Sequence, residues 1–514
     1  DNKFYCNGKF MSGPAIQPAV LIALLIVGTG NAAFCAGLSA QALGKSVLMI
    51  DAAPEPELGG NSRYTAGAMR FAYSSRDELL GLLTHPNDAR LQRTDFGEYS
   101  QQQFLGDLRS FNGTQSLTPQ QHFLVEQSLP LMNWLRSLGI TFSPIYSRQA
   151  FEQDGRYKFW GSLTLCAEGE GEGLVQRQRE IFLSRGGEIR YDTRAVELLT
   201  EHGENNTSSK KVVGILAHCS NDSSVQLHAN AVVLACGGFE ANEDLRVQHL
   251  GPARQHAKVR GSRFNQGHGI TMAQRAGAAL AGRFTGCHAT PMDRHMPNYG
   301  NPDMPHIERK NYRKISYPFG IMLNAKGERF VDEGANFRNY TYAQYGQKIL
   351  EQPKHFAWQI FDAQVMDLLY EEYRVEFASR VEANSLVELV DLLDDIDQAQ
   401  ALATLTEFNS SITTHIEFDP TIKDGRATAG LPINKTNWAL PIEQPPFVAY
   451  PVTCGITFSY GGLNVNLQGE VLDAAEHPVR GLFACGELVG DVFFEGYPGG
   501  SGLTSGGVFG RTAG

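Results

Sequence analysis

One stretch near the start of the chain limits the possible folds more than any other. The apolar run AVLIALLIV, residues 19–27, is followed directly by GTGNAAFCAGLSAQALGKSVLMID, residues 28–51. The run predicts a fully buried strand, and the small residues at 31–43 predict a helix that packs closely against it. A second strand ends at Asp51. This strand–turn–helix–strand unit is typical of an α/β fold with a parallel sheet.

The turn of this unit, Gly28-x-Gly30-x-x-Ala33, predicts a binding site for a dinucleotide. Gly28 permits the tight turn, Gly30 lets the backbone approach a pyrophosphate, and Ala33 lets helix and strand pack closely. The N–H groups at the helix N-terminus face the phosphates. Asp51 lies 21 residues after Gly30, where a carboxylate can accept hydrogen bonds from ribose hydroxyls.

The length and composition indicate a globular protein with more than one domain. At 514 residues the chain exceeds what a single core usually supports, so we expect at least two domains. Apolar residues make up 42% and charged residues 19%, which excludes a disordered chain. The net charge of -11 argues against nucleic acid or an anionic membrane as the main partner.

The cysteines and the apolar runs predict neither a metal site nor a membrane span. None of the eight cysteines forms a C-x-x-C pair or has zinc-ligand spacing, so we predict buried thiols rather than a disulfide framework, as in a cytoplasmic protein. The run at 19–27 is too short for a bilayer, which needs about 20 residues. A signal peptide is the alternative, since Lys3 and Lys9 precede the run, but the sequence after it is a nucleotide-binding turn.

Long motifs in a fixed order carry a resemblance to a known family. They are GGNS (59–62), LACGGFEAN (234–242), GSRFNQGHGITMAQRAGAAL (261–280), GERFVDE (327–333) and GLFACGE (481–487). Together they resemble the flavoprotein family of fumarate reductase, succinate dehydrogenase, aspartate oxidase and 3-ketosteroid dehydrogenase. Within the family, TGCHATP (285–291), GERFVDEGANFRNYTYAQYG (327–346), FVAYPVTCGITFSYGGLNVN (447–466) and GYPGGSGLTSGGVFGRTAG (496–514) are most similar to FAD-dependent tricarballylate dehydrogenase. The resemblance covers residues 20–514.

The resemblance implies an architecture of two domains. A discontinuous, Rossmann-like FAD-binding domain is expected from residues 20–287 and 452–514. An α+β capping domain, residues 288–451, is expected as an insertion between these parts. The substrate is expected between the cap and the flavin, because small-molecule sites commonly lie at domain interfaces.

The resemblance also assigns FAD-binding residues to distant segments. Glu487 reaches the ribityl chain, and Val196 meets adenine through its backbone. The helix N-terminus at Ser501, Gly502 and Leu503 points at the flavin ring, where its N–H groups stabilise the negative charge of reduced flavin. The other expected contacts are Gly28, Gly30, Asn31, Ala32, Ala33, Asp51, Ala52, Gly59, Gly60, Asn61, Ser62, Thr65, Ala66, Ala235, Gly237 and Gly486. Some relatives attach FAD through a histidine, but Tyr64 stands at that position, so we expect non-covalent FAD.

Four residues are the expected catalytic groups. Arg338 matches the arginine that moves the proton in fumarate reductases, with Tyr340 and Phe337 as rivals for the position. An arginine is always charged and can hold a carboxylate with two hydrogen bonds. His288 matches a histidine that binds a substrate carboxylate. Tyr497 matches a catalytic tyrosine of ketosteroid dehydrogenases and can donate to a carbonyl or carboxylate oxygen.

The sequence departs from the family pattern at two positions. Phe458 stands where fumarate reductases carry a histidine, which makes a classical fumarate site incomplete. His268 stands in the place of the usual aspartate of a G-D-G motif. Arg63 and Arg70 lie near the expected ring and are candidates for binding further carboxylates, although surface arginines are more common.

Two activities are compatible with these residues. The first is an FAD-dependent oxidoreductase that introduces or reduces a C=C bond beside a carboxylate by hydride transfer to or from flavin N5, similar to tricarballylate dehydrogenase. The alternative is an enone-forming dehydrogenase or reductase that acts on a ketone, which Tyr497, Tyr340 and Phe458 favour. The sequence has no iron–sulfur cysteine pattern, so electrons are expected to pass through a separate partner, a quinone or O2.

Overall fold

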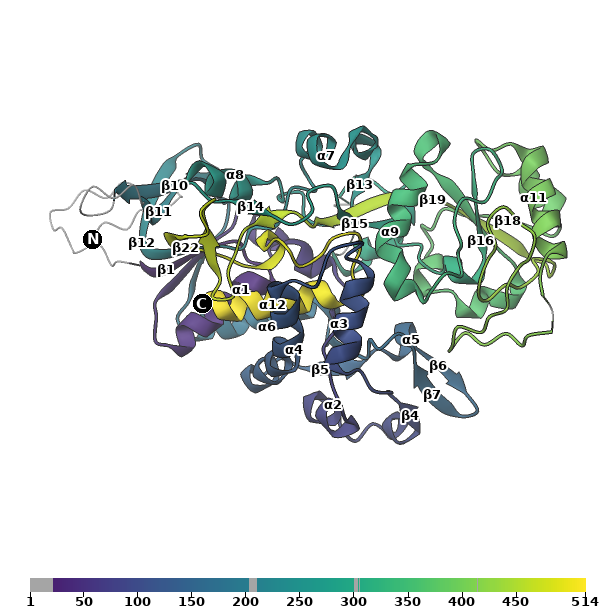
Figure 1. Cartoon of the computed structure of the whole chain (residues 1–514), viewed down its shortest axis with the longest axis horizontal. Helices are drawn as coiled ribbons and strands as arrows, with labels where there is room; N and C mark the ends of the chain where they lie inside the picture. Colours follow the sequence, from purple (N-terminus) through teal and green to yellow (C-terminus); the bar gives the residue numbers. More distant parts are fainter. Residues whose placement is uncertain (1–21, 203–209, 300–303, 305, 414) are drawn as a thin grey trace.

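An eight-stranded sheet lies towards one end of the molecule and contains the strand–turn–helix–strand unit that the first motif predicts (Figure 1). The computed structural model describes residues 22–202, 210–299, 304, 306–413 and 415–514. The strands in spatial order are β10 (Thr193–His202), β11 (Lys210–Cys219), β22 (Pro478–Ala484), β12 (Ser224–Leu234), β1 (Ile22–Val27), β2 (Val47–Ile50) and β9 (Glu188–Arg190), with β21 (Glu470–Leu472) beside β22. The run from β22 to β9 is parallel, which confirms the α/β class.

The predicted strand–turn–helix–strand unit is present at the centre of this sheet. β1 leads through the glycine turn into α1 (Asn31–Ala42), and β2 follows. Val27 pairs with Ile50 on one side and with Leu234 on the other. The carboxyl ends of three strands therefore meet at one edge, the edge at which open α/β sheets bind ligands. Residues 1–21, including the first part of the predicted run, lie outside the described residues.

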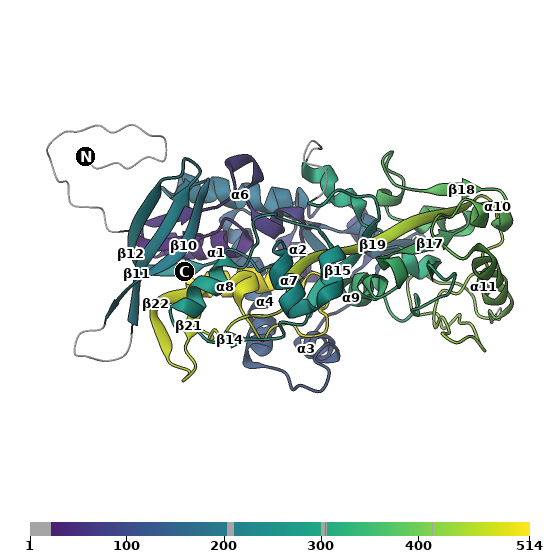
Figure 2. The same ribbon diagram turned by 90° about the horizontal axis from the view of Figure 1, so that it is seen from above.

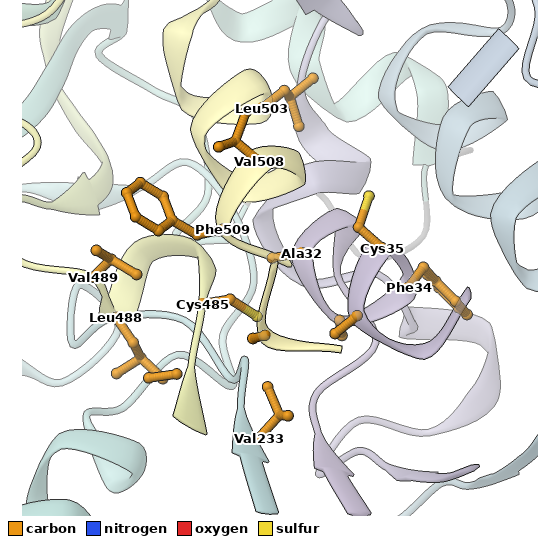
Figure 3. Close-up of a cluster of buried hydrophobic side chains, with 14 of the residues drawn as sticks. Ala32, Phe34, Cys35, Val233, Cys485, Leu488, Val489, Leu503, Val508 and Phe509 are labelled. Atoms are coloured by element: carbon orange, nitrogen blue, oxygen red, sulfur yellow. The ribbon is translucent and has the colours of Figure 1, made fainter. Parts of the chain in front are cut away.

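The glycine-rich end of the chain forms a buried helix, α12 (Ser501–Ala513), that packs against α1 (Figure 1). A Cβ on Gly510 would lie 2.4 Å from the carbonyl oxygen of Ala32. Only a residue without a side chain allows this approach of two helix backbones. Figure 3 shows the core at this contact, where Ala32, Phe34 and Cys35 of α1 lie near Leu503, Val508 and Phe509 of α12.

The other helices of this part of the molecule cover the sheet and extend it. They are α2 (Arg76–Leu82), α3 (Gln101–Ser110), α4 (Pro119–Leu138), α5 (Tyr146–Gln149), α6 (Glu170–Ser184), α7 (Glu243–Leu250) and α8 (His268–Arg275). Small sheets join them: β3 (Ala68–Met69), β8 (Leu165–Ala167) and β5 (Phe142–Pro144); β4 (Thr94–Asp95), β7 (Arg156–Phe159) and β6 (Ala150–Gln153); β14 (Leu280–Ala281) and β20 (Gly462–Leu463).

A second sheet lies at the other end of the elongated molecule (Figures 1 and 2). Its strands are β13 (Lys258–Val259), β19 (Phe447–Ser459), β17 (Ala357–Phe361) and β16 (Ile321–Asn324) in spatial order, with β15 (Cys287–Asp293) and β18 (Val381–Ala383) also paired to β19. Its helices are α9 (Arg338–Leu350), α10 (Leu386–Asp391) and α11 (Gln398–Ser410).

Strand β19 runs as one continuous element from this sheet towards the eight-stranded sheet (Figure 2). β15 pairs with it antiparallel from Cys287 opposite Ser459 to Asp293 opposite Val452. Both predicted domain boundaries, at 287/288 and 451/452, fall within this strand pair. The division into an FAD-binding domain and a capping domain stays a prediction.

Most of the cysteines are free thiols, as predicted, but one forms a disulfide. Cys35, Cys166, Cys236, Cys287, Cys454 and Cys485 are free, but Cys219 is disulfide-bonded. No cysteine spacing in the sequence signals a disulfide, because a single bridge leaves no repeated pattern. Within the described ranges, no group of three His, Cys, Asp or Glu side chains is arranged to hold a metal ion. No helix among these residues is long and apolar enough to cross a membrane.

Candidate active site

A large cavity lies at the carboxyl edge of the parallel strands and extends to the β15–β19 pair. Its empty space, including the open mouth, is about 2040 Å³. Its walls come from the turn after β1, the ends of β2, β12 and β22, the N-terminus of α12, and residues of β15, β19 and α9. A dinucleotide and a small substrate can therefore share one cavity.

Most of the predicted cofactor residues line this cavity. They are Gly28, Gly30, Asn31, Ala32, Asp51, Ala52, Gly60, Asn61, Ser62, Thr65, Ala66, Ala235, Gly237, Gly486, Glu487, Gly502 and Leu503. Ala33, Gly59, Val196 and Ser501 lie outside the lining. Ala33 is fully buried, and Ser501 Oγ donates to the Pro498 carbonyl at 2.7 Å. Ala195 lines the cavity in place of Val196.

The turn after β1 has the geometry that a pyrophosphate requires. Gly28 has φ +115°, and a Cβ there would lie 2.3 Å from the Ala235 carbonyl oxygen. The backbone N–H of Asn31 donates to Ser62 Oγ at 3.0 Å, which ties the GGNS segment to the N-terminus of α1. The N-cap residue Gly30 has no side chain to cap this N-terminus, so the N–H groups beyond Asn31 and the helix dipole can serve an anion.

The end of β2 supplies the carboxylate expected for a ribose. Asp51 Oδ1 accepts from the Ala53 N–H at 2.8 Å, and Asp51 Oδ2 accepts from Thr29 Oγ1. Burial raises the pKa of Asp51, and the Thr29 hydroxyl opposes this change. His268 also lines this end, and its Nδ1 lies 3.4 Å from Arg194 Nη1. Burial and the Arg194 charge lower the pKa of His268, so it is neutral near pH 7.

The N-terminus of α12 faces the middle of the cavity. Asn31 Nδ2 donates to the Leu503 carbonyl at 2.9 Å and thus fixes α12 to α1. Glu487 reaches the cavity from the other side, and Ser459 holds its Oε1 through the backbone N–H at 2.7 Å and through Oγ at 3.0 Å. Glu487, the N-terminus of α12 and the dinucleotide turn all line this cavity, and together they fit FAD.

Aromatic rings surround His288 at the β15–β19 end of the cavity. Phe458 stacks on the imidazole at 5.3 Å between ring centroids, and Tyr342 and Tyr497 meet it edge-on at 5.0 and 5.1 Å. The hydroxyl oxygens of the two tyrosines are 2.5 Å apart. Burial and the nearby Arg260 charge hold the pKa of His288 well below its usual value, so His288 is a neutral group.

Four arginines line the same end of the cavity: Arg148, Arg260, Arg313 and Arg338. Glu372 pairs with two of these four arginines. Its Oε1 lies 2.9 Å from Arg148 Nη2 and 2.8 Å from Arg313 Nη2. Burial alone would raise the pKa of Glu372, but the two guanidinium charges lower it to about 2. Burial, together with neighbouring arginines, lowers the pKa of Arg260 and Arg313 to about 10.

Arg338 is held by aromatic rings and a carbonyl rather than by a carboxylate. Its guanidinium lies 3.7 Å from the Tyr370 ring centroid and 4.4 Å from that of Trp160. Its Nη2 donates to the Arg148 carbonyl. Burial and the Arg148 charge hold the pKa of Arg338 well below its usual value. In the described part of the chain, no carboxylate lies within ion-pair distance of this guanidinium.

The structure does not bring Tyr340, Arg63 or Arg70 into the cavity. The Tyr340 hydroxyl donates to Asp107 Oδ2 at 2.9 Å. Arg70 is fully buried and donates to the Gly499 carbonyl at 2.7 Å, and Arg63 pairs with Glu172. The residues that α9 directs into the cavity are Arg338, Asn339 and Tyr342, because positions three and four apart share one helix face.

Sequence reasoning missed several residues of the lining: Arg148, Arg194, Arg260, Arg313, Tyr342 and Tyr370. Tyr342 had a signal, since it follows Arg338 by one helical turn. The arginines had none, because they come from separate loops and strands, and an arginine in a loop is usually a surface residue. Tertiary structure alone brings these cations together.

Fold and site define an FAD-binding α/β oxidoreductase, and comparison with known proteins agrees. A protein-family model described as an FAD binding domain matches residues 23–503, so the chain belongs to this FAD-binding family. It is an FAD-dependent enzyme of the class that oxidises or reduces CH–CH groups.

Relatives of known name lie within that class. A probable fumarate reductase, Ifc3, of Shewanella frigidimarina is 26% identical over 98% of this chain and 76% of its own length. An open flavocytochrome c3 fumarate reductase shares the fold with a TM-score of 0.69 and 24% identity, over 96% of this chain and 78% of that one. A 3-ketosteroid Δ1-dehydrogenase of Sterolibacterium denitrificans has a TM-score of 0.70 and 20% identity, over 95% and 98% of the two chains.

The neutral state of His288 predicts a pH dependence of stability in the substrate-free protein. An unfolded histidine titrates near pH 6.5, whereas folding lowers the pKa of His288. Its contribution is therefore present above pH 6.5 and is lost as the pH falls below 6.5 towards the folded pKa. Between pH 7.5 and 5.5, we expect the wild type to lose roughly 1 kcal/mol more unfolding free energy than H288Q. Thermal unfolding at both pH values measures this difference.

The exposed residue His122 provides the control, and H122Q should keep the wild-type pH dependence. Equal losses in wild type and H288Q would show that His288 is charged or accessible to water in the folded protein.

Proposed function

We propose that the substrate carries several carboxylates and that the enzyme introduces or reduces a C=C bond next to one of them, as a tricarballylate dehydrogenase does. The observation that carries this proposal is the excess of buried guanidinium charge at the β15–β19 end of the cavity. Four arginines line that end, and Glu372 pairs with Arg148 and Arg313. Arg260 and Arg338 remain as cations for an anionic ligand.

Burial makes these two charges costly without an anion. The exposed fractions of Arg260 and Arg338 are 9% and 4%, and Arg260 Nε is buried without a hydrogen-bond acceptor among the described residues. A buried charge is stable only when it is paired and hydrogen-bonded. Substrate carboxylates would supply both the charge and the acceptors. A neutral ketone would supply at most one acceptor and no charge.

Each residue then has a physical task. When bound, FAD supplies the hydride acceptor or donor at its N5 atom. Arg338 and Arg260 bind carboxylates and orient the substrate. Arg338 also stabilises negative charge at the carbon beside a carboxylate and is our candidate for holding the proton that moves there. The rings of Phe458, Tyr342 and Tyr497 exclude water around the reacting carbons, and neutral His288 can donate a hydrogen bond without adding charge.

The pair of Tyr342 and Tyr497 favours the alternative, a ketone substrate. Their hydroxyl groups are hydrogen-bonded to each other at 2.5 Å inside the cavity. One phenol can therefore donate to a substrate carbonyl while the second phenol donates to the oxygen of the first. This arrangement suits enolate formation. The apolar face of Phe458 would suit a large hydrophobic substrate. The unpaired arginines have no task in this alternative.

We also propose that FAD is bound without a covalent link. Tyr64, which stands at the position of the attached histidine in some relatives, is buried and lies outside the cavity lining. Its backbone carbonyl accepts from Arg260 Nη2 at 3.3 Å. Acid precipitation should release all the flavin into the supernatant. Yellow colour that stays in the washed pellet would demonstrate a covalent link.

The electron partner, the cellular location and the domain division stay proposals. We expect a separate electron carrier, a quinone or O2 to exchange electrons with the flavin. A cytoplasmic location is the expectation from composition, and the disulfide at Cys219 weighs against it, since cytosolic disulfides are rare. The cap is proposed to span residues 288–451 and to close the substrate end of the cavity.

Anaerobic mixing of the oxidised holoenzyme with tricarballylate tests the proposed function. We expect the flavin absorbance to bleach in the wild type. In R338Q, kcat/KM should fall roughly 10²–10³-fold, the equivalent of about 3–4 kcal/mol for an unpaired substrate charge.

R263Q is the matched control, because Arg263 is half exposed, pairs with Glu57 at the surface and lies outside the cavity. It should behave as wild type within about twofold. No bleaching by tricarballylate, together with bleaching by a saturated ketone, would replace the proposed function by its alternative.

A further inference from the structure

Two glutamates meet behind the cofactor cavity. Glu240 follows β12 and Glu487 follows β22, and these strands are parallel neighbours that end at Leu234 and Ala484, which pair. The two side chains thus emerge at the same edge of the sheet. Glu487 lines the cavity, whereas Glu240 is fully buried and lies outside the lining.

Gly237 and Gly238 leave the space that the two glutamates and their hydrogen-bond partners occupy. A Cβ on Gly238 would lie 2.0 Å from Glu487 Oε1 and 2.3 Å from Ser459 Oγ. A Cβ on Gly237 would lie 2.5 Å from Asn265 Nδ2. The glycine pair of the LACGGFE segment therefore accommodates a polar network behind the cofactor as well as the cofactor itself.

Hydrogen-bond donors surround the carboxyl oxygens of this pair, but one oxygen has none. Glu240 Oε1 accepts from Asn61 Nδ2 and from Asn265 Nδ2, each at 2.6 Å. Glu487 Oε1 accepts from the backbone and the hydroxyl of Ser459. Glu240 Oε2 is buried and has no N–H or O–H donor in the described part of the chain. Asn61 Nδ2 also lies 3.5 Å from Glu487 Oε2, so one amide contacts both acids, and the two carboxyl groups interact directly.

Two buried carboxylates in contact cannot both be ionised at neutral pH. The neighbouring groups do not remove this conflict. Arg246 donates to the backbone oxygen of Glu240 at 2.7 Å rather than to its carboxylate, and burial raises the pKa of the thiols of Cys236 and Cys287 to about 12. Asn61, Asn265 and Ser459 are neutral donors. One proton between the two acids is the remaining solution.

We propose that Glu240 and Glu487 share one proton, carried by Glu487 and donated to Glu240, and that Glu240 is a positioning residue for the FAD site. The arrangement gives the orphaned oxygen of Glu240 its donor. It also keeps the negative charge of the pair on the residue that lies outside the cavity. In support, burial and the adjacent Glu240 hold the pKa of Glu487 well above its usual value. The inference rests on the FAD site and does not depend on the identity of the substrate.

The two glutamine variants are predicted to differ in the flavin midpoint potential. In E487Q, the amide oxygen can take the Ser459 donors while the amide N–H₂ donates to Glu240, which copies the protonated acid. Its potential should equal that of the wild type. In E240Q, the amide oxygen must accept from Asn61 and Asn265, so the amide N–H₂ faces Glu487 and favours its carboxylate. The charge then moves into the cavity lining, and the potential should become more negative.

The experiment combines this potential with an infrared spectrum of the holoenzyme at pH 7, with and without ¹³C-labelled glutamate. We expect a protonated-carboxyl C=O band that shifts with the label in the wild type and in E243Q, which changes an exposed glutamate of α7. The band should be absent from E487Q and from E240Q. The label excludes Asp51, whose pKa is also raised.

Three results would overturn the proposal: no labelled acid band in the wild type, a band that persists in E487Q, or potentials that rise in both variants. The last result would mean that both acids are ionised in the wild type. If E240Q does not fold, E487Q alone decides through the band.

Discussion

The contact between α1, the first helix, and α12, the last, determines where the helix N-termini and strand ends that line the cavity can lie. Asn31 on α1 donates to the carbonyl of Leu503 on α12, a residue 472 positions away. Gly510 brings the backbone of α12 against Ala32. Two helix N-termini are thereby directed at one cavity, and the ends of β1, β2, β12 and β22 reach the same edge. A dinucleotide that bears both phosphates and an electron-accepting ring suits such a cavity.

The structural features that the sequence predicts are those that depend on local backbone geometry. The β1–α1–β2 unit and the glycine turn need residues of one kind at fixed spacing, and the structure confirms the unit within the described residues. Gly28, Asp51 and Gly486, three of the predicted cofactor contacts, line the cavity. The glycine-rich end forms a helix rather than a loose tail, because its small residues permit contact with α1.

The parts that the sequence could not predict depend on side chains that meet from distant segments. Arg148 comes from a short helix after β5, Arg260 from a loop after β13, and Arg313 from a loop before β16. Nothing in their local sequence separates them from surface arginines. Tyr340 shows the converse error, since a motif alignment with one residue of slack cannot tell which face of α9 is directed at the cavity. The helix places Tyr342 there instead.

Both ends of the cavity contain buried charged groups. At the cofactor end, two acids are in contact; at the substrate end, several cations surround Glu372. Each end departs from charge neutrality in a protein interior, where such an imbalance is costly. We therefore expect the substrate to be an anion that offsets the positive charge at its end of the cavity, so that its chemistry follows from this charge more than from the shape of the cavity.

The most direct measurement is the affinity of the oxidised holoenzyme for citrate, malonate and acetate, read from the perturbation of the flavin spectrum at low and at physiological salt. These anions carry three, two and one carboxylate. If unpaired arginines bind the substrate, Kd should rise about tenfold or more with each carboxylate removed, and salt should weaken the binding of citrate most, as expected for ligands held by several cations. Equal affinities for the three anions, or tighter binding of a neutral steroid enone, would contradict the claim that unpaired arginines define the substrate.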